Sequence, residues 1–205
     1  MHLYHHPMSS NARRAMMTAH HLGLKLDLVE INLASAADRR RLAEINPNNM
    51  IPVLEDDGFL LSESGAIMQY LADCTPRQTV YPTDPTLRAD VNRWLFWAAQ
   101  HFGPAIGVIT WEGVWKKVLE GTDPDPAELA RGRRDLAKFA AVLEQRLDGR
   151  TWLAGEAVTL AEYAVAAPLM YMEAARLPLA AYPRLLEWFG RVQQLDAWRA
   201  TNPVW

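Results

Sequence analysis

Two periods of apolar and polar residues follow one another along the first third of the chain. Residues 10–22 have apolar positions at helical spacing, and Gly23 closes that run. Residues 26–31 show the alternation of apolar and polar positions that is typical of a strand. Asp57-Gly58 separates two short apolar runs and is typical of a tight hairpin turn. The pattern predicts strands at 2–4, 26–31, 53–55 and 59–61 and helices at 10–22, 38–45 and 63–73. This β-α-β-α-β-β-α order predicts a small mixed sheet with helices on its faces.

Residues 75–85 carry three prolines and no periodicity, which indicates a linker. Everything after it has helical spacing, beginning near Leu87, with Gly103-Pro104 expected to kink or interrupt the first helix. Later helices are expected from Asp125-Pro126 to Asp148-Gly149, from the Thr159–Glu162 capping box to Ala175, and, last, from near Pro183. The chain therefore divides into an α/β domain at 1–75, a linker at 76–86 and an all-α domain at 87–205.

Composition narrows the class of protein. The 205 residues are 50% hydrophobic and 22% charged, with a formal net charge of -3. No basic block stands out, which argues against nucleic acid as the main partner. Cys74 is the only cysteine, so no internal disulfide forms. We find no signal peptide and no apolar stretch long enough to span a membrane, and we expect a cytoplasmic protein.

The most informative motif is Asn-Pro-Asn-Asn-Met-Ile-Pro-Val-Leu at 46–54, followed by Asp57-Gly58 and by Glu-Ser-Gly-Ala-Ile at 63–67. Proline at the start of a strand is an edge or turn feature. A helix that opens at Glu63-Ser64 offers free N–H groups that bind a carboxylate. The segment is suited to holding a small extended peptide with an acidic end.

These residues resemble the glutathione-binding half of the glutathione S-transferase superfamily, in particular its serine-type, theta/delta-like bacterial members. The resemblance continues through Tyr81-Pro82, Thr159–Glu162 and the run from Tyr182 to Trp188, so it covers essentially the whole chain. It implies a thioredoxin-like N-terminal domain, an all-helical C-terminal domain, and a transferase that uses glutathione as co-substrate. It also implies a homodimer.

A catalytic hydroxyl is expected where the first helix opens, because glutathione reacts as a thiolate. Ser9-Ser10-Asn11 stands there, and these residues are also good helix N-caps. Serine-type relatives carry Ser and, four residues on, Arg; Ser9 with Arg13 and Ser10 with Arg14 both fit. We prefer Ser9 because the following residues then fall into the usual register. Asn11 matches relatives in which the amide assists the thiolate.

For glutathione itself, the resemblance assigns the backbone of Ile51, beside Pro52, to the cysteinyl part. It assigns Glu63 and Ser64 to the γ-glutamyl end. Asn49 and Met50 are departures, since many relatives have Lys, Gln or His there to reach the glycyl carboxylate. Met50 cannot donate a hydrogen bond, whereas Asn49 can substitute in part.

The resemblance implies an electrophile pocket between the domains, lined by the first loop and the first long helix. Six side chains are candidates for its lining: His6, Met8, Trp97, His101, Ala105 and Trp111. Such residues at helical spacing more often belong to a core than to a pocket. The histidines lack metal-ligand spacing, so we expect no metal site.

Three functions remain open on these residues. The first is a transferase that adds the glutathione thiolate to a small hydrophobic electrophile. The second is a non-catalytic member that binds ligands or partners, which Met50 favours. The third is a related glutathione-dependent isomerase, dehalogenase or etherase.

Overall fold

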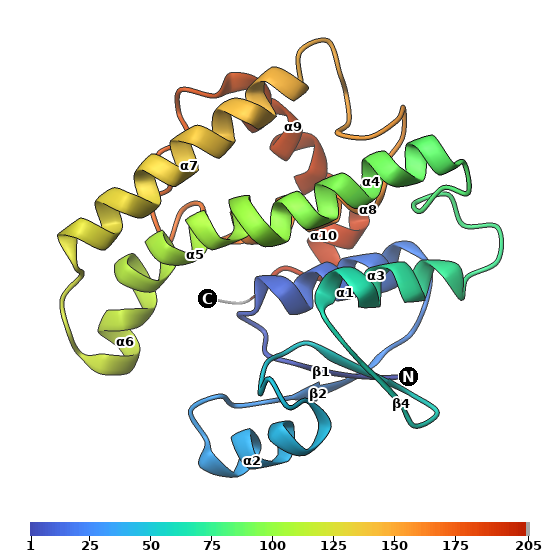
Figure 1. Ribbon diagram of the computed structural model, residues 1–205, viewed down its shortest axis with the longest axis horizontal. Coiled ribbons are helices and arrows are strands. Elements are labelled where there is room, and N and C mark those ends of the chain that lie inside the picture. Colours follow the sequence, from blue (N-terminus) through green and yellow to red (C-terminus); the bar gives the residue numbers. More distant parts are fainter. Residues whose placement is uncertain (204–205) are drawn as a thin grey trace. The chain divides into compact units, whose positions relative to one another are not determined.

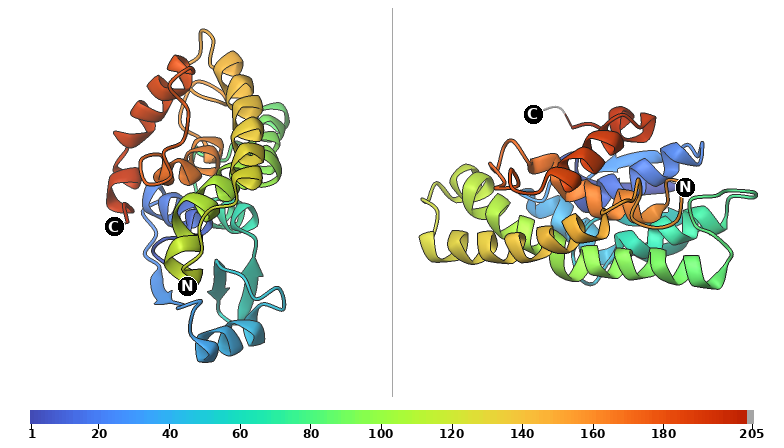
Figure 2. Two further views of the ribbon diagram at one scale, coloured as in Figure 1. Left: turned by 90° about the vertical axis from the view of Figure 1, so that its left-hand side faces the viewer. Right: turned by 90° about the horizontal axis from the view of Figure 1, so that it is seen from above.

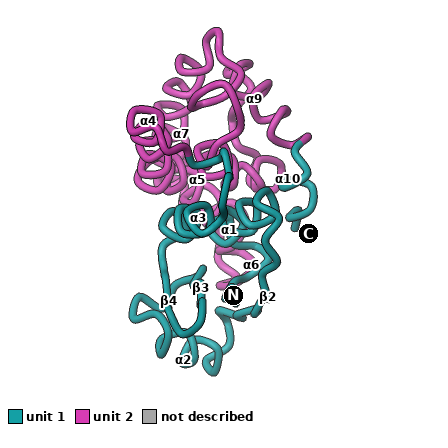
Figure 3. The backbone as a smooth tube through the Cα atoms, turned by 90° about the vertical axis from the view of Figure 1, so that its right-hand side faces the viewer, with its two compact units in different colours: residues 1–81, 195–205 teal, residues 82–194 magenta. Residues whose placement is uncertain are grey.

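A computed structural model describes residues 1–203 and divides the chain into two compact units. The first comprises Met1–Tyr81 together with the C-terminal segment from Leu195 onward (Figure 3). The second comprises Pro82–Gln194. Val204 and Trp205, at the end of the expected second domain, lie outside the described residues.

The first unit contains a four-stranded mixed sheet with the order β2-β1-β3-β4. Its strands are β1 (His2–His5), β2 (Asp27–Glu30), β3 (Val53–Asp56) and β4 (Phe59–Ser62). β1 pairs with β2 in parallel, and the other two pairings are antiparallel. Asp57 and Gly58 both have positive φ, as a two-residue hairpin requires. The predicted mixed sheet is confirmed.

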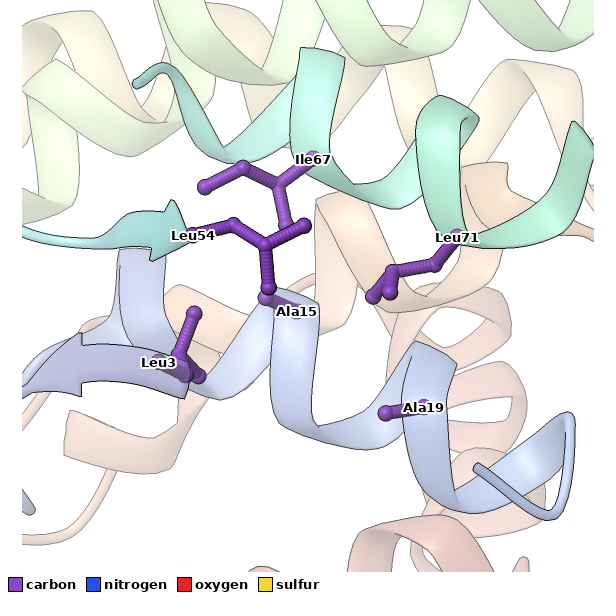
Figure 4. Close-up of a cluster of buried hydrophobic side chains, with 6 residues drawn as sticks. All are labelled: Leu3, Ala15, Ala19, Leu54, Ile67 and Leu71. Atoms are coloured by element: carbon purple, nitrogen blue, oxygen red, sulfur yellow. The ribbon is translucent and has the colours of Figure 1, made fainter. Parts of the chain in front are cut away.

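Helices cover both faces of this sheet (Figure 1). Helices α1 (Ser10–His21) and α3 (Ser64–Asp73) lie on one face and α2 (Ala36–Ile45) on the other. A cluster on the first face unites strand and helix side chains, namely Leu3, Leu54, Ala15, Ala19, Ile67 and Leu71 (Figure 4). The opposite face buries Tyr4, Ile31, Leu42 and Val53. Neighbours along a strand thus point to opposite faces, as strand geometry requires.

A short helix, α10 (Asp196–Ala200), returns to this unit and packs against α1. The helix expected near Pro183 is α9 (Pro183–Gln193). It was expected to be the last helix, but α10 follows it. Five residues are too few for a periodic signal, and α10 is held by long-range contacts of Trp198 instead.

The second unit is helical, as expected. Helical backbone runs from Pro85 to Glu120 through α4 (Pro85–Trp97), α5 (Gly103–Thr110) and α6 (Lys116–Glu120). π-helical turns at Ala98–Phe102 and Trp111–Trp115 join them. Pro104 therefore widens the helix rather than ending it, because a π turn shifts the carbonyls that the proline ring would meet.

Three further helices complete the second unit. They are α7 (Pro126–Arg146), which lies alongside the α4–α5 stretch (Figures 1 and 2), α8 (Leu160–Ala166) and α9. The side chain of Asp125 caps α7, as predicted. Thr159 and Glu162 form the predicted capping box, but the run to Ala175 continues only as a 3₁₀ turn at Ala167–Tyr171. In the part of the chain described, no helix is long and apolar enough to cross a membrane.

Candidate active site

Strand register brings three chain junctions to one end of the sheet. Tyr4 stands opposite Val53, and Val53 stands opposite Ser62. Because these pairings are antiparallel, the end of β1, the start of β3 and the end of β4 lie at the same end of the sheet. The loop before α1, the Ile51-Pro52 segment and the first residues of α3 therefore lie next to one another. The Ile51–Pro52 peptide bond is cis.

Ser9 is the N-cap of α1. Its Oγ accepts a hydrogen bond from the Ala12 N–H at 3.2 Å, and its backbone is extended. Ser10 follows as the first helical residue, and both serines are half-buried. A hydroxyl that accepts from a backbone N–H still has its own proton to donate. Ser9 therefore presents a donor at the positive end of a helix.

Asn11 and Ser64 are joined by one buried side chain, that of Arg14. Nη1 of Arg14 lies 2.8 Å from Oδ1 of Asn11 and 3.4 Å from Oγ of Ser64. Arg14 and Ser64 are buried, whereas Asn11 is exposed. The first turns of α1 and α3 are thus connected through one guanidinium. From the sequence, Arg14 was singled out only for its spacing from Ser10, although Asn-x-x-Arg on a helix predicts a same-face contact.

The loop before β3 is organised by Asn46, a buried residue that we did not single out from the sequence. Its Nδ2 donates to the Met50 carbonyl at 2.7 Å, and its Oδ1 accepts from the Asn48 N–H at 3.1 Å. Asn49 has a φ of 53°, a left-handed conformation that asparagine tolerates. Met50 is 68% exposed. Asn46 thereby fixes the backbone that leads into Ile51 and Pro52.

Glu63 precedes α3 with a φ of 69°, in the left-handed region that non-glycine residues seldom occupy. Such backbone strain clusters at binding sites. The Glu63 side chain is exposed, and Ser64 is the first residue of the helix. An acid and a hydroxyl therefore stand together at the N-terminus of α3.

The first loop contains two adjacent histidines with different surroundings. His6 is half-buried, and its Nδ1 accepts from the N–H of Met8, which is also half-buried. His5 is buried, and its Nδ1 has no hydrogen-bond partner among the described residues. Burial lowers the pKa of His5, which favours the neutral imidazole. Among residues 1–203, no three or more His, Cys, Asp or Glu side chains are placed to hold a metal ion.

The Tyr4 side chain is held by a hydrogen bond and by packing in the core. Its hydroxyl donates to Oε2 of Glu55 at 2.7 Å, and its ring packs with Ile31, Leu42 and Val53. The hydrogen bond to Glu55 raises the pKa of Tyr4. This side chain is therefore committed to the face that carries α2.

The remaining pocket candidates belong to the second unit. Trp97 and His101 lie together, with ring centroids 6.5 Å apart, and both rings contact Phe139 of α7. Ala105 is buried in α5, and Trp111 is 37% exposed in the second π-helical turn. Trp97 and His101 thus share an aromatic cluster with α7.

Comparison with known proteins identifies the family. The N-terminal domain model of glutathione S-transferases matches residues 3–78, and the C-terminal domain model matches residues 126–191. Glutathione S-transferase 1 of Manduca sexta is 30% identical, with 98% of this chain and 92% of the relative covered. A glutathione S-transferase of Hyoscyamus muticus is 28% identical, covering 97% and 95%.

Solved structures agree with this result. A delta-class glutathione transferase of Nilaparvata lugens has a TM-score of 0.85 at 28% identity, covering 98% of this chain and 92% of that one. A glutathione S-transferase of Rhodospirillum rubrum has a TM-score of 0.87 at 26% identity, covering 98% and 90%. The chain belongs to the glutathione S-transferase family, with the expected thioredoxin-like and all-helical parts. Its relatives come from insects, plants and a bacterium, so the comparisons support the family and not a bacterial subgroup.

Proposed function

We propose that the chain is a glutathione transferase in which the Ser9 hydroxyl stabilises the thiolate of bound glutathione. Family membership implies glutathione as the co-substrate. The observation that carries the proposal is the position of Ser9, which caps α1 beside the Ile51-Pro52 and Glu63-Ser64 junctions. Ser10 is the first residue of the helix and is the less favourable candidate. Ser9, as the N-cap, precedes the first turn.

The energy that this chemistry requires is available at such a site. A free thiol with a pKa of about 8.5 is only a few per cent ionised at neutral pH, and lowering the pKa by about two units requires roughly 2.7 kcal/mol. A hydrogen bond to a charged group contributes about 1.5–3 kcal/mol. A helix N-terminus adds about 0.3–1 kcal/mol. A hydroxyl and a helix end together are sufficient.

The other proposed contacts follow the polarity of glutathione. The backbone of Ile51, held beside Pro52, pairs with the cysteinyl part. The N-terminus of α3 at Ser64 receives the γ-glutamyl carboxylate, and the Glu63 carboxylate receives the γ-glutamyl ammonium. Asn49 is the proposed donor to the glycyl carboxylate. The Met50 side chain has no donor to offer, and the Met50 carbonyl already accepts from Asn46.

We propose a small hydrophobic electrophile, because the side chains singled out for it are aromatic, apolar or imidazole. In the reaction the thiol proton leaves to water, and the sulfur electron pair forms a bond to the electrophilic carbon. In a substitution the leaving group departs with the electrons of its own bond; in an addition the electrons of the broken π or ring bond move to the neighbouring atom, which takes a proton from water. We also propose a homodimer, since the chain exposes Phe59, Leu60 and Phe96, which are large apolar side chains.

The test is a pH profile of kcat/KM with an activated aryl chloride. Wild type is compared with Ser9→Ala and Ser10→Ala. We expect Ser9→Ala to lose about 100-fold at neutral pH, typical of removing one donor to a developing anion. Ser10→Ala is expected to stay within about threefold, since about 0.7 kcal/mol corresponds to that factor. Full activity in Ser9→Ala would overturn the assignment. Glutathione binding without turnover in wild type would favour a non-catalytic member.

A further inference from the structure

Arg14 is a buried cation between two helix N-termini. Only 5% of the residue is exposed, and its Nη1 donates to Oδ1 of Asn11 at 2.8 Å and to Oγ of Ser64 at 3.4 Å. Asn11 belongs to the first turn of α1, and Ser64 begins α3. One side chain therefore contacts both the proposed thiol end and the proposed γ-glutamyl end of the site.

These contacts determine which hydrogen-bonding groups remain for a ligand. Arginine can only donate, so the atoms that it contacts must act as acceptors. When Oδ1 of Asn11 accepts from Arg14, the amide NH₂ is the group left to face outward. When Oγ of Ser64 accepts from Arg14, its own O–H proton is available to a ligand. Both side chains become donors, which a thiolate and a carboxylate require.

Arg14 also keeps its charge in this position. Burial lowers the pKa of Arg14 to about 10, which leaves the guanidinium protonated at neutral pH. A positive charge behind two helix N-termini adds to the attraction for anions there.

The neighbouring arginine provides a contrast within the same helix. Arg13 is equally buried, yet it contacts residues of the C-terminal segment, among them Trp198 and Asn202. The two arginines leave α1 in different directions. The hydrogen bonds of Arg13 go to Trp198, Thr201 and Asn202, so Arg13 serves as a matched control.

We propose that Arg14 is a positioning residue that turns Asn11 and Ser64 into hydrogen-bond donors toward glutathione. The inference rests on the proposed function of this site. Arg14 acts through Asn11 on the sulfur and through Ser64 on the γ-glutamyl carboxylate. It does not touch the reacting atoms itself.

The experiment titrates the thiol of enzyme-bound glutathione by ultraviolet absorbance in wild type, Arg14→Met, Arg13→Met and Asn11→Asp. Methionine fills a buried site without a charge or a donor. We expect Arg14→Met to raise the thiol pKa by about one unit and the KM for glutathione about tenfold, as losing a charge-assisted hydrogen bond implies. Arg13→Met is expected to lower the melting temperature and leave the thiol pKa unchanged.

Asn11→Asp tests the polarity directly. Aspartate can still pair with Arg14, so the fold is expected to persist, but it presents an acceptor instead of an amide donor. The thiol pKa should rise in this variant. If Arg14→Met fails to fold, Asn11→Asp decides the question alone.

Two results would overturn the inference: equal thiol pKa values in Arg14→Met and Arg13→Met, or an unchanged thiol pKa in Asn11→Asp. Ser9→Ala belongs in the same series. A shift in Ser9→Ala without one in the Arg14 and Asn11 variants rejects only the role of Arg14. No shift in Ser9→Ala rejects the proposed catalytic hydroxyl itself.

Discussion

The guanidinium carbon of Arg13 lies 3.6 Å from the centre of the Trp198 ring. The same guanidinium donates to the Trp198 carbonyl at 3.0 Å and to Oδ1 of Asn202 at 2.8 Å. Arg13 is in α1 and Trp198 in α10, almost the whole chain apart. The C-terminal segment therefore stabilises the helix that carries Ser9 at its N-terminus.

Replacing Trp198 by alanine should destabilise the protein. The side chain is buried, so the change removes apolar contact and the cation–π pair, and we expect a loss of about 3 kcal/mol in unfolding free energy. Urea denaturation measures it. Arg133→Met, at an exposed position of α7, is the control and should change stability by less than about 0.5 kcal/mol. Equal stability of Trp198→Ala and wild type would contradict the anchoring role.

Asn46→Ala should weaken glutathione binding more than turnover. The amide of Asn46 holds the Met50 carbonyl and the Asn48 N–H, so its loss frees the backbone proposed to pair with the cysteinyl part. We expect the KM for glutathione to rise about tenfold, equivalent to about 1.4 kcal/mol, with kcat changed less. Asn48→Ala, which keeps the backbone N–H, is the matched control. A selective loss of kcat in Asn46→Ala would argue against this view.

Hydrophobic periodicity predicted the strands and main helices because each has one buried face. Leu3 and Tyr4, or Val53 and Leu54, alternate between the two clusters as the pattern indicates. The π-helical turns at 98–102 and 111–115 were not predicted, since one inserted residue hardly changes helical spacing. Likewise α10 depends on Trp198 meeting Arg13, a contact between distant residues that no local pattern encodes.

The positions of candidate site residues could be predicted where a local motif determines the backbone, as at the start of a helix. Ser9 caps a helix, and Ser64 opens one, as their positions indicated. The roles of Arg14 and Asn46 were not predicted. Each side chain is buried and forms hydrogen bonds that depend on how the chain folds around it. A sequence shows that an arginine is present, but not that α3 packs over it.

Glu162 should make stability depend on pH. Burial raises the pKa of Glu162 to about 7 from its ordinary 4.5. The folded state then binds more protons between these values, so stability is greatest below the lower pKa and falls as pH rises to about 7. A shift of this size corresponds to about 3 kcal/mol at most.

The comparison is with Glu162→Gln, which has no titrating group at this position. Unfolding free energies across this pH range should fall more steeply in wild type than in the variant. Where Glu162 is ionised, the variant also lacks an acceptor, because an amide cannot accept both from the Leu153 N–H and from the two donors of Thr159. Identical pH slopes would contradict the assigned pKa.

The proposed homodimer predicts that a charge at Phe96 disrupts association. Phe96 is 62% exposed on α4, and an apolar ring left in water is typical of a partner surface. Sedimentation velocity should show a dimer for wild type and a monomer for Phe96→Asp. Arg133→Asp, at an exposed polar position of α7, is the control and should remain dimeric. A monomeric wild type would reject the proposal.

The most direct test of the catalytic role of Ser9 is the thiol pKa of bound glutathione. Ultraviolet difference absorbance follows the thiolate as the pH is raised, in wild type, Ser9→Ala and Ser10→Ala. We expect a pKa about two units below that of the free thiol in wild type and Ser10→Ala, and a return toward about 8.5 in Ser9→Ala. A thiol that titrates at its free value in wild type, or equally in wild type and Ser9→Ala, would contradict the account.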